Sequence, residues 1–169
     1  MRLFLGLPLQ ADIQAELDHW RSVSLPAFSR PVDAANFHLT LAFLGEVNNA
    51  QLRSVVDLSE GVIASPFTFR LDELGYWPKQ EICYLAPKDV PEPLIELAES
   101  TLQVARRSGL RTEKRRYRPH LTMARRCQSP PPAPLIEPAF DIPCTEFCLF
   151  ESHRTRKGVR YEILQSFDL

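Results

Sequence analysis

A four-residue pattern occurs twice in the chain, and this duplication restricts the fold more than any other feature of the sequence. Residues 38–41 read His-Leu-Thr-Leu, and residues 120–123 read His-Leu-Thr-Met. Residues two apart in a strand point to the same face, so each His shares a face with its Thr while the apolar residues point to the core. Each half of the chain also has an amphipathic helix before its motif and a strand pair after it. We therefore expect an antiparallel α+β protein of two pseudo-symmetric lobes, each a sheet with helices packed outside.

Hydrophobic periodicity predicts the elements around the two motifs. Apolar residues at helical spacing indicate helices at 11–23, from Leu52 to Ile63, and from Leu94 to Ala105, with Gly109 as the stop signal of the last one. Apolar or alternating runs indicate strands at 2–8, 36–44, 67–76, 81–86, 120–124, 144–151 and 159–167. The proline-rich run at 129–134 is a stiff loop, too short for a domain linker. We therefore expect residues 1–169 to form a single bilobal domain.

Length and composition agree with one domain that folds without cross-links. A chain of this length buries about 70% of its unfolded surface. The contents of 44% hydrophobic and 24% charged residues are ordinary for a soluble protein. No apolar run approaches the ~18 residues of a membrane span, and no signal-peptide cleavage site follows the N-terminal strand. The four cysteines match no zinc pattern and are interpreted as reduced thiols, with a structural disulfide as the alternative. We expect a cytoplasmic monomer without cofactor or metal.

The net charge of −1 hides two basic clusters. Residues 106–126 contain nine basic side chains and one acidic side chain, a net charge of +8, and residues 154–160 add +4. The rest of the chain is therefore strongly acidic. A basic surface on an acidic body attracts anionic ligands. The alternative is a solvated basic helix end, since cations favour helix C-termini. Charge alone leaves both interpretations open.

Two imidazoles and two hydroxyls facing one cleft suit acid–base chemistry on a phosphate. The unperturbed pKa of histidine, near 6.5, lets one ring be neutral while the other is protonated close to neutral pH. The neutral ring can take a proton from water while the cationic ring protonates a leaving oxygen, and the hydroxyls can bind phosphate oxygens. The sequence has no G-x-S-x-G nucleophile motif, and neither His motif contains a carboxylate for a metal. This combination predicts the metal-free opening of a cyclic phosphodiester.

The motifs and their surroundings resemble the 2H phosphoesterase superfamily. The first motif extends as HLTLAFLGEV over residues 38–47, and the second as PHLTMAR over residues 119–125. Within the superfamily, the chain is similar to the bacterial RNA 2′,3′-cyclic phosphodiesterase (2′-5′ RNA ligase) family over nearly its whole length. The resemblance implies two lobes with the active-site cleft between their sheets. It also implies hydrolysis of RNA 2′,3′-cyclic phosphate ends to 2′-phosphomonoesters, with reverse 2′-5′ ligation as a side activity.

The resemblance assigns a role to each matched residue of the motifs. It implies that His38 is the proton donor to the leaving 3′ oxygen and that His120 is the proton acceptor that activates water. The spacing of the residues by itself leaves this direction open. Thr40 and Thr122 are expected to bind the phosphate.

Arg125 and Phe43 complete the predicted site. Arg125 matches an arginine of the family that contacts phosphate, and Phe43 matches an aromatic residue that stacks on the base. Each stands five residues beyond a motif His. Strict alternation would turn both away from the His face, so the strands must bulge or end there. The alternatives are a surface ion pair for Arg125 and a core position for Phe43. Tyr76 and Trp77 are interpreted as structural side chains, with a position lining the cleft as the alternative.

Two other functions fit parts of the sequence. A phosphodiesterase for a small nucleotide, such as a nucleotide cyclic phosphate or a 2′-5′ oligoadenylate, would keep the same site. An RNA-binding module without catalysis would use the basic clusters but not the two histidines. The paired motifs favour an enzyme, and the basic clusters favour a longer polyanion. We therefore expect RNA with a 2′,3′-cyclic phosphate end, or a related nucleotide, as the partner, and no membrane.

Overall fold

The computed structural model describes residues 1–169 and contains nine strands and three α-helices. The strands are β1 (Arg2–Pro8), β2 (His38–Glu46), β3 (Phe67–Leu71), β4 (Glu73–Trp77), β5 (Ile82–Ala86), β6 (Leu121–Ala124), β7 (Phe140–Cys144), β8 (Glu146–Thr155) and β9 (Gly158–Asp168). The helices are α1 (Ala11–Ser24), α2 (Asn49–Glu60) and α3 (Glu92–Arg107), with a 3₁₀ turn, η1, at Ala34–Asn36. None of these helices is long and apolar enough to cross a membrane.

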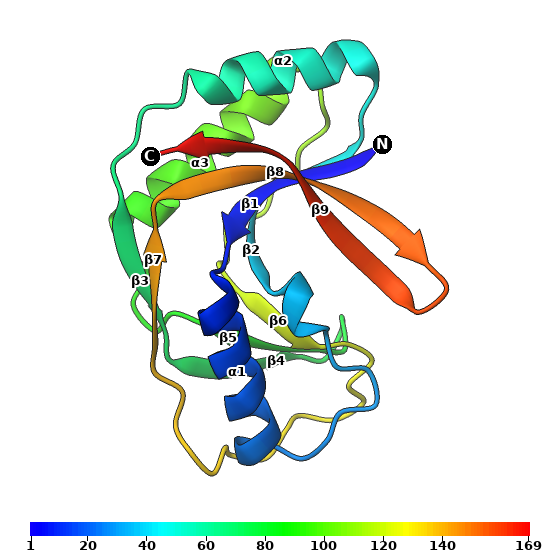
Figure 1. Ribbon diagram of the computed structural model, residues 1–169, viewed down its shortest axis with the longest axis vertical. Coiled ribbons are helices and arrows are strands. Elements are labelled where there is room, and N and C mark those ends of the chain that lie inside the picture. The colour runs from blue at the N-terminus through cyan, green and yellow to red at the C-terminus, as the bar shows by residue number, and fades with distance from the viewer.

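Two antiparallel sheets hold the two motif strands (Figure 1). The larger sheet has the strand order β2-β1-β8-β9 and the smaller one the order β4-β5-β6, while β3 and β7 form a separate ribbon. The motif strands β2 and β6 each lie at the edge of their sheet. Each also pairs with the strand that precedes it across a helix, as β1–α1–β2 and β5–α3–β6. The two halves of the chain therefore share one arrangement, which confirms the prediction from the duplicated motif.

Leucine side chains from both sheets form a common core. Leu5, Leu39, Leu85 and Leu121 are all fully buried in it. Burial of one such side chain contributes about 1.5–3 kcal/mol. Because Leu39 and Leu121 each follow a motif histidine, their burial turns the histidines and threonines to the opposite face of the strand. The core therefore fixes which way the motif side chains point.

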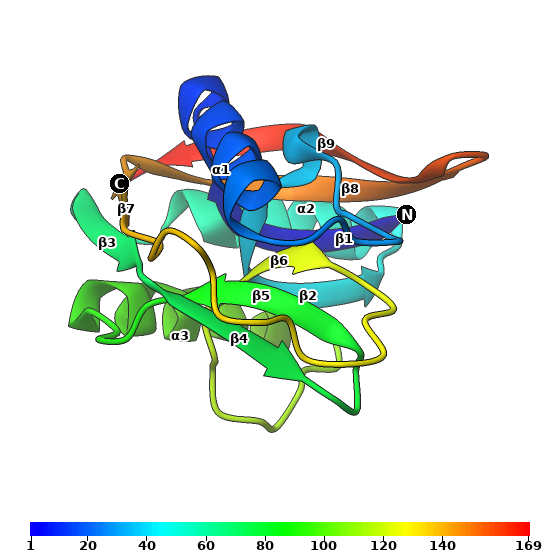
Figure 2. The same ribbon diagram turned by 90° about the horizontal axis from the view of Figure 1, so that it is seen from below.

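Helices α1 and α3 lie on opposite sides of the molecule (Figure 2). Each helix contacts the motif strand of the other half of the chain, α1 through the side chain of Arg21 and α3 by direct packing. Arg21 of α1 donates hydrogen bonds to the backbone oxygen of Val32, at 2.8 Å, and to that of Met123 in β6, at 2.7 Å. Helix α3 packs against β2 and α2. The halves therefore exchange their helices, which ties the two lobes together.

The end of α3 follows the predicted stop signal. Gly109 has a φ of +73°, in the left-handed region that favours glycine. The Leu110 N–H donates to the Ala105 oxygen and the Gly109 N–H to the Arg106 oxygen, which is a Schellman motif. The chain leaves the helix at this point and enters the basic segment that leads to the second motif.

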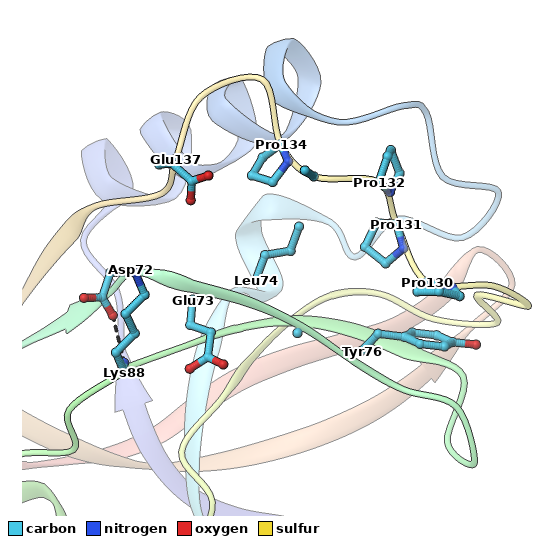
Figure 3. Close-up of a pocket in the computed structure, with 12 residues that line it drawn as sticks. Asp72, Glu73, Leu74, Tyr76, Lys88, Pro130, Pro131, Pro132, Pro134 and Glu137 are labelled. Carbon is cyan, nitrogen blue, oxygen red and sulfur yellow. Dashed lines mark hydrogen bonds between the residues drawn. The ribbon is translucent and has the colours of Figure 1, made fainter.

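Two expectations about the middle of the chain are wrong. The strand predicted at 67–76 is divided into β3 and β4, which belong to different sheets, because Asp72 breaks the run. Its carboxylate accepts a hydrogen bond of 2.8 Å from the Lys88 N–H (Figure 3). The helix predicted to reach Ile63 ends at Glu60, since Gly61 caps it, and Ile63 is 97% exposed.

The strand boundaries near the first motif and near the C-terminus also differ from the expectation. The strand predicted at 36–44 begins at His38, after η1, and extends to Glu46. Cys144 ends β7, a strand that was not predicted, and does not begin β8. Strand β7 pairs with β3 along its whole length. The four cysteines are unpaired, and three of them are buried.

Candidate active site

Hydrogen bonds orient both ring nitrogens of His38. Nδ1 lies 2.7 Å from the backbone oxygen of Asn36. Because a carbonyl oxygen only accepts, Nδ1 carries the proton in the neutral ring. Nε2 lies 3.1 Å from Thr40 Oγ1 and accepts a hydrogen bond from that hydroxyl. The strand geometry therefore aims the basic nitrogen of His38 along the same face as Thr40.

His120 is oriented in the same way. Its Nδ1 lies 2.8 Å from the backbone oxygen of Arg118, again two residues before the histidine. Donation from Nδ1 leaves Nε2 as the unprotonated nitrogen of the neutral ring. The Trp77 ring meets His120 edge-on at 4.6 Å between centroids, and the Arg118 guanidinium lies 5.1 Å over Trp77. The second lobe thus repeats the backbone bond of the first but surrounds its histidine with different side chains.

Three aromatic rings surround His38. Phe4 of β1 lies 4.8 Å, Phe150 of β8 5.8 Å and Tyr161 of β9 4.7 Å from His38, measured between ring centroids. These residues come from three neighbouring strands of the larger sheet. They hold the ring of His38 in place and shield it from water.

A β-bulge returns Phe43 to the face of His38. In the pairing of β2 with β1, Thr40 lies opposite Gly6 and Phe43 opposite Phe4, with a register shift between them that leaves Leu41 extra. Phe43 therefore shares the face of Phe4, at 6.2 Å between ring centroids. It is 57% exposed, so its ring is open to a ligand and the alternative core position is wrong.

The second motif strand bulges at the equivalent residue and then ends. In the pairing of β6 with β5, Met123 is the extra residue between Thr122 and Ala124. Strand β6 ends at Ala124, and the Arg125 N–H donates to the Arg30 oxygen at 3.0 Å. The prediction that both strands bulge or end before the fifth residue is confirmed.

Burial and positive charge lower the pKa of both histidines. The pKa of His38 is lowered to about 4, mainly by burial and also by the charges of Arg125 and His120, while the hydrogen bond to Asn36 opposes the shift. Burial also lowers the pKa of His120, as do the charges of Arg125 and Arg118. Arg125 therefore acts on both rings, and no ion pair of Arg125 with a carboxylate is present. The structure brings His38, His120 and Arg125 together.

Tyr117 connects the two lobes at this site. Its hydroxyl donates a hydrogen bond of 3.0 Å to the backbone oxygen of Thr40 in the other motif strand. Burial raises the pKa of Tyr117, so the phenol stays protonated and remains a donor. Thr122, on the second strand, lies opposite Tyr84 in the pairing with β5. Strands β2 and β6 contact each other, so the two motif threonines lie on neighbouring strands.

Several residues of the site had no signal in the sequence. Phe4, Phe150 and Tyr161 read as ordinary strand residues, because only the strand order β2-β1-β8-β9 gathers them around His38. For Trp77 the alternative position holds, since its ring contacts His120. Arg118 stands two residues before His120, and this position next to the second motif was the only sequence signal that it belongs to the site. Tyr76, in contrast, has a structural bond, since its hydroxyl donates to the Cys127 oxygen at 2.6 Å.

A groove of about 310 Å³ lies away from the histidines, between β4 and the proline-rich loop (Figure 3). Asp72, Glu73 and Glu137 line it together with prolines of the run at 130–134. None of the six residues predicted for the site lines this groove. Its acidic side chains would repel a phosphate, so it is not a part of the histidine site.

Comparison with known proteins agrees with this geometry. The LigT-like phosphoesterase family profile matches the chain twice, over residues 7–84 and 85–161, one match for each motif. The chain is 37% identical to the RNA 2′,3′-cyclic phosphodiesterase of Escherichia coli K12, over 99% of this chain and 96% of that protein.

The structure is similar to two solved complexes of E. coli LigT. The complex with 3′-AMP has a TM-score of 0.89 and 34% identity, over 99% of this chain and 97% of that one. The complex with NADP⁺ has a TM-score of 0.89 and 34% identity, over 99% and 96%. The paired motif strands, the double match of the family profile and the full-length similarity lead to one conclusion: this chain belongs to the LigT-like phosphoesterase family.

Proposed function

We propose that this protein is an RNA 2′,3′-cyclic phosphodiesterase, which opens the cyclic phosphate at an RNA end to a 2′-phosphomonoester. The observation that carries this proposal is the matched orientation of His38 and His120. Each Nδ1 donates to the backbone oxygen two residues earlier, so each Nε2 is left for proton transfer. The name of the E. coli relative supports the same reaction. All 169 residues act as one catalytic unit, because each lobe supplies one histidine.

In the proposed reaction, two proton transfers open the ring. His120 Nε2 takes a proton from water, and the hydroxide oxygen attacks the phosphorus. The bond between phosphorus and the 3′ oxygen breaks, and protonated His38 gives its Nε2 proton to that oxygen. The phosphate stays on the 2′ oxygen. When the 5′-hydroxyl of a second RNA takes the place of water, the same steps form a 2′-5′ linkage, which we propose as a side activity.

The direction of proton transfer follows from the resemblance, and a bound phosphate helps His38 to act as the acid. Burial lowers the pKa of His38 to about 4 and also lowers the pKa of His120, so both rings are neutral at neutral pH in the free protein. A bound phosphate anion favours the protonated form of His38, because an opposite charge nearby raises the pKa of a histidine.

The remaining residues of the site bind the substrate. Thr40 and Thr122 donate hydroxyl hydrogen bonds to the non-bridging phosphate oxygens, and Arg125 supplies a charge-assisted bond to the same group. The exposed ring of Phe43 stacks on the terminal base, a contact worth about 1–3 kcal/mol. These groups hold the phosphorus between the two rings, which is the main requirement of a reaction without metal.

The ligands of the similar structures fit this substrate. In 3′-AMP and in NADP⁺, the two ligands of the E. coli LigT complexes, a ribose carries a phosphate at its 3′ or 2′ position. A 2′,3′-cyclic phosphate spans the same two positions. Recognition of a ribose that carries phosphate next to a base is therefore the common chemistry.

Phosphorus NMR of the purified protein tests the proposal directly. The substrates are 2′,3′-cyclic AMP and an adenosine hexanucleotide that ends in a 2′,3′-cyclic phosphate, both in excess EDTA. We expect a single new signal of a 2′-phosphate from each. A 3′-phosphate signal would contradict the proposed bond cleavage, and loss of turnover in EDTA would contradict the metal-free mechanism. Salt-sensitive binding of the hexanucleotide without turnover would identify an RNA-binding module instead.

A further inference from the structure

The β8–β9 hairpin extends beyond the body of the molecule (Figures 1 and 2). Its strands stay paired from the sheet to the turn, where Thr155 lies opposite Gly158. The outer part carries four exposed basic side chains, Arg154, Arg156, Lys157 and Arg160. The proposed reaction of a single terminal nucleotide does not use this charge.

The base of the hairpin is fixed to the backbone that orients His38. The Asn36 side chain donates to the Val159 oxygen at 2.7 Å and accepts from the Tyr161 N–H at 3.2 Å, and so pairs with the free edge of β9. The backbone oxygen of the same Asn36 accepts from His38 Nδ1. A ligand on the hairpin is therefore held in a defined position relative to His38.

One face of the hairpin is continuous with the surroundings of His38. Directly opposed residues of an antiparallel pair share a face, and so do residues two apart along a strand. Phe150, which contacts His38, therefore shares its face with Ser152 and Arg154, and with their partners Tyr161 and Val159. We name these residues the site face. Arg154 lies about 13 Å from Phe150 at 3.3 Å per residue.

The opposite face of the hairpin has a different charge pattern. It carries Glu151 and His153 of β8 with their partners Glu162 and Arg160 of β9. His153 Nε2 lies 3.4 Å from a carboxylate oxygen of each glutamate. Arg160 therefore stands on a face with two acidic side chains, whereas Arg154 stands on a face with aromatic and aliphatic ones. Only the site face combines apolar surface with unopposed positive charge.

We propose that the site face of the hairpin binds the single-stranded RNA that precedes the terminal nucleotide. This inference rests on the proposed function, because the cyclic phosphate must lie between the histidines. Single-stranded nucleic acids bind where a basic track follows the backbone and rings contact the bases. Arg154, and Arg156 and Lys157 at the turn, contact the phosphates upstream of the cyclic end. A mononucleotide at His38 does not extend to Arg154, so the hairpin makes the enzyme prefer oligonucleotides.

Two variants of the same hairpin test this proposal with equal changes of charge. Arg154→Gln removes a charge from the site face, and Arg160→Gln removes one from the opposite face. The kcat/KM is measured for the cyclic-phosphate hexanucleotide and for 2′,3′-cyclic AMP at several salt concentrations. We expect the ratio of the two kcat/KM values to fall about threefold to tenfold in Arg154→Gln, as for one lost phosphate contact. The ratio in Arg160→Gln should stay within about twofold, and only Arg154→Gln should weaken the salt dependence.

Binding of the hexanucleotide, measured by fluorescence anisotropy, separates this inference from the proposed function. Equal losses in the two variants, or equal kcat/KM for both substrates in the unmodified protein, would overturn the hairpin proposal while hydrolysis stands. Absence of all turnover, with binding that still depends on Arg154, would overturn the proposed function and support the hairpin. Absence of turnover with binding independent of Arg154 would overturn both. Circular dichroism confirms that the two exposed positions tolerate glutamine.

Discussion

His38 in the larger sheet and His120 in the smaller one make the same hydrogen bond to the backbone but have different surroundings. Both donate from Nδ1 to a carbonyl two residues earlier, at 2.7 and 2.8 Å, and both precede a bulge at the same offset. His38, however, has three aromatic rings around it and accepts a bond from Thr40. His120 has two, Trp77 and Tyr84, and the guanidinium of Arg118 lies over the Trp77 ring. The duplicated motif therefore fixes the orientation of the rings, and the unequal environments fix their basicity.

In the proposed reaction, a symmetric scaffold supports an asymmetric transfer of protons. The same residue type would serve as both acid and base, so the surroundings of each ring must separate the two roles. Burial in the larger sheet lowers the pKa of His38 to about 4, and burial in the smaller sheet lowers the pKa of His120. Substitutions confined to one lobe therefore test how far the two histidines differ.

Removal of either imidazole is expected to have the largest effect. His38→Ala and His120→Ala should each lower kcat for 2′,3′-cyclic AMP by about 10²–10⁴-fold, the usual contribution of general acid or base catalysis. His19→Ala, at an exposed position of α1, is the matched control and should retain full activity. Steady-state kinetics on the three variants makes the test. Full activity in either motif variant would show that the two lobes do not divide the reaction.

Arg125 is the charge that both histidines share, so its removal should change both lobes together. Arg125→Gln should lower kcat/KM by about 10–100-fold, because a charged hydrogen bond to the phosphate is lost. It should also raise the pKa of His38 and of His120, since Arg125 lowers both. NMR titration of the histidine ring protons measures these shifts. The neighbouring exposed residue provides the control Arg126→Gln, and equal shifts in this variant would refute the special position of Arg125.

The sequence predicts the parts of this site that depend on local pattern. Alternation placed His38 with Thr40, and the offset of Phe43 required the bulge that the pairing of β2 with β1 contains. The division of β3 from β4 had a local signal, since the apolar alternation changes phase between Leu71 and Leu74, but the pairing of the two strands with different sheets depends on distant residues. The aromatic rings around His38 come together through pairings between the ends of the chain, which no local window contains.

The pH dependence of kcat/KM should reveal the lowered pKa values of the two histidines. Activity needs one protonated and one neutral imidazole. Below the pKa of His38, about 4, both rings are protonated and the base is lost. Above the pKa of His120, which lies below 6.5, both are neutral and the acid is lost. We expect a bell-shaped profile with its maximum between these limits and a fall of about tenfold per pH unit on the alkaline side. A maximum above pH 7 in the free enzyme would contradict the lowered pKa values, and Arg125→Gln should move the profile to higher pH.

Tyr117 offers the smallest and most selective test, because it joins the lobes without touching either histidine through its hydroxyl. Tyr117→Phe removes the bond to the Thr40 oxygen and should lower the free energy of unfolding by about 1 kcal/mol. Tyr76→Phe removes a similar hydrogen bond, from the Tyr76 hydroxyl to the Cys127 oxygen, and should lower the free energy of unfolding by about the same amount. Only Tyr117→Phe should also lower kcat, by less than about tenfold, because a small displacement between the motif strands reduces the alignment of the two rings. Denaturant unfolding and kinetics on both variants decide the matter: an equal loss of kcat in the two would mean that general stability, and not the spacing of the lobes, limits the reaction.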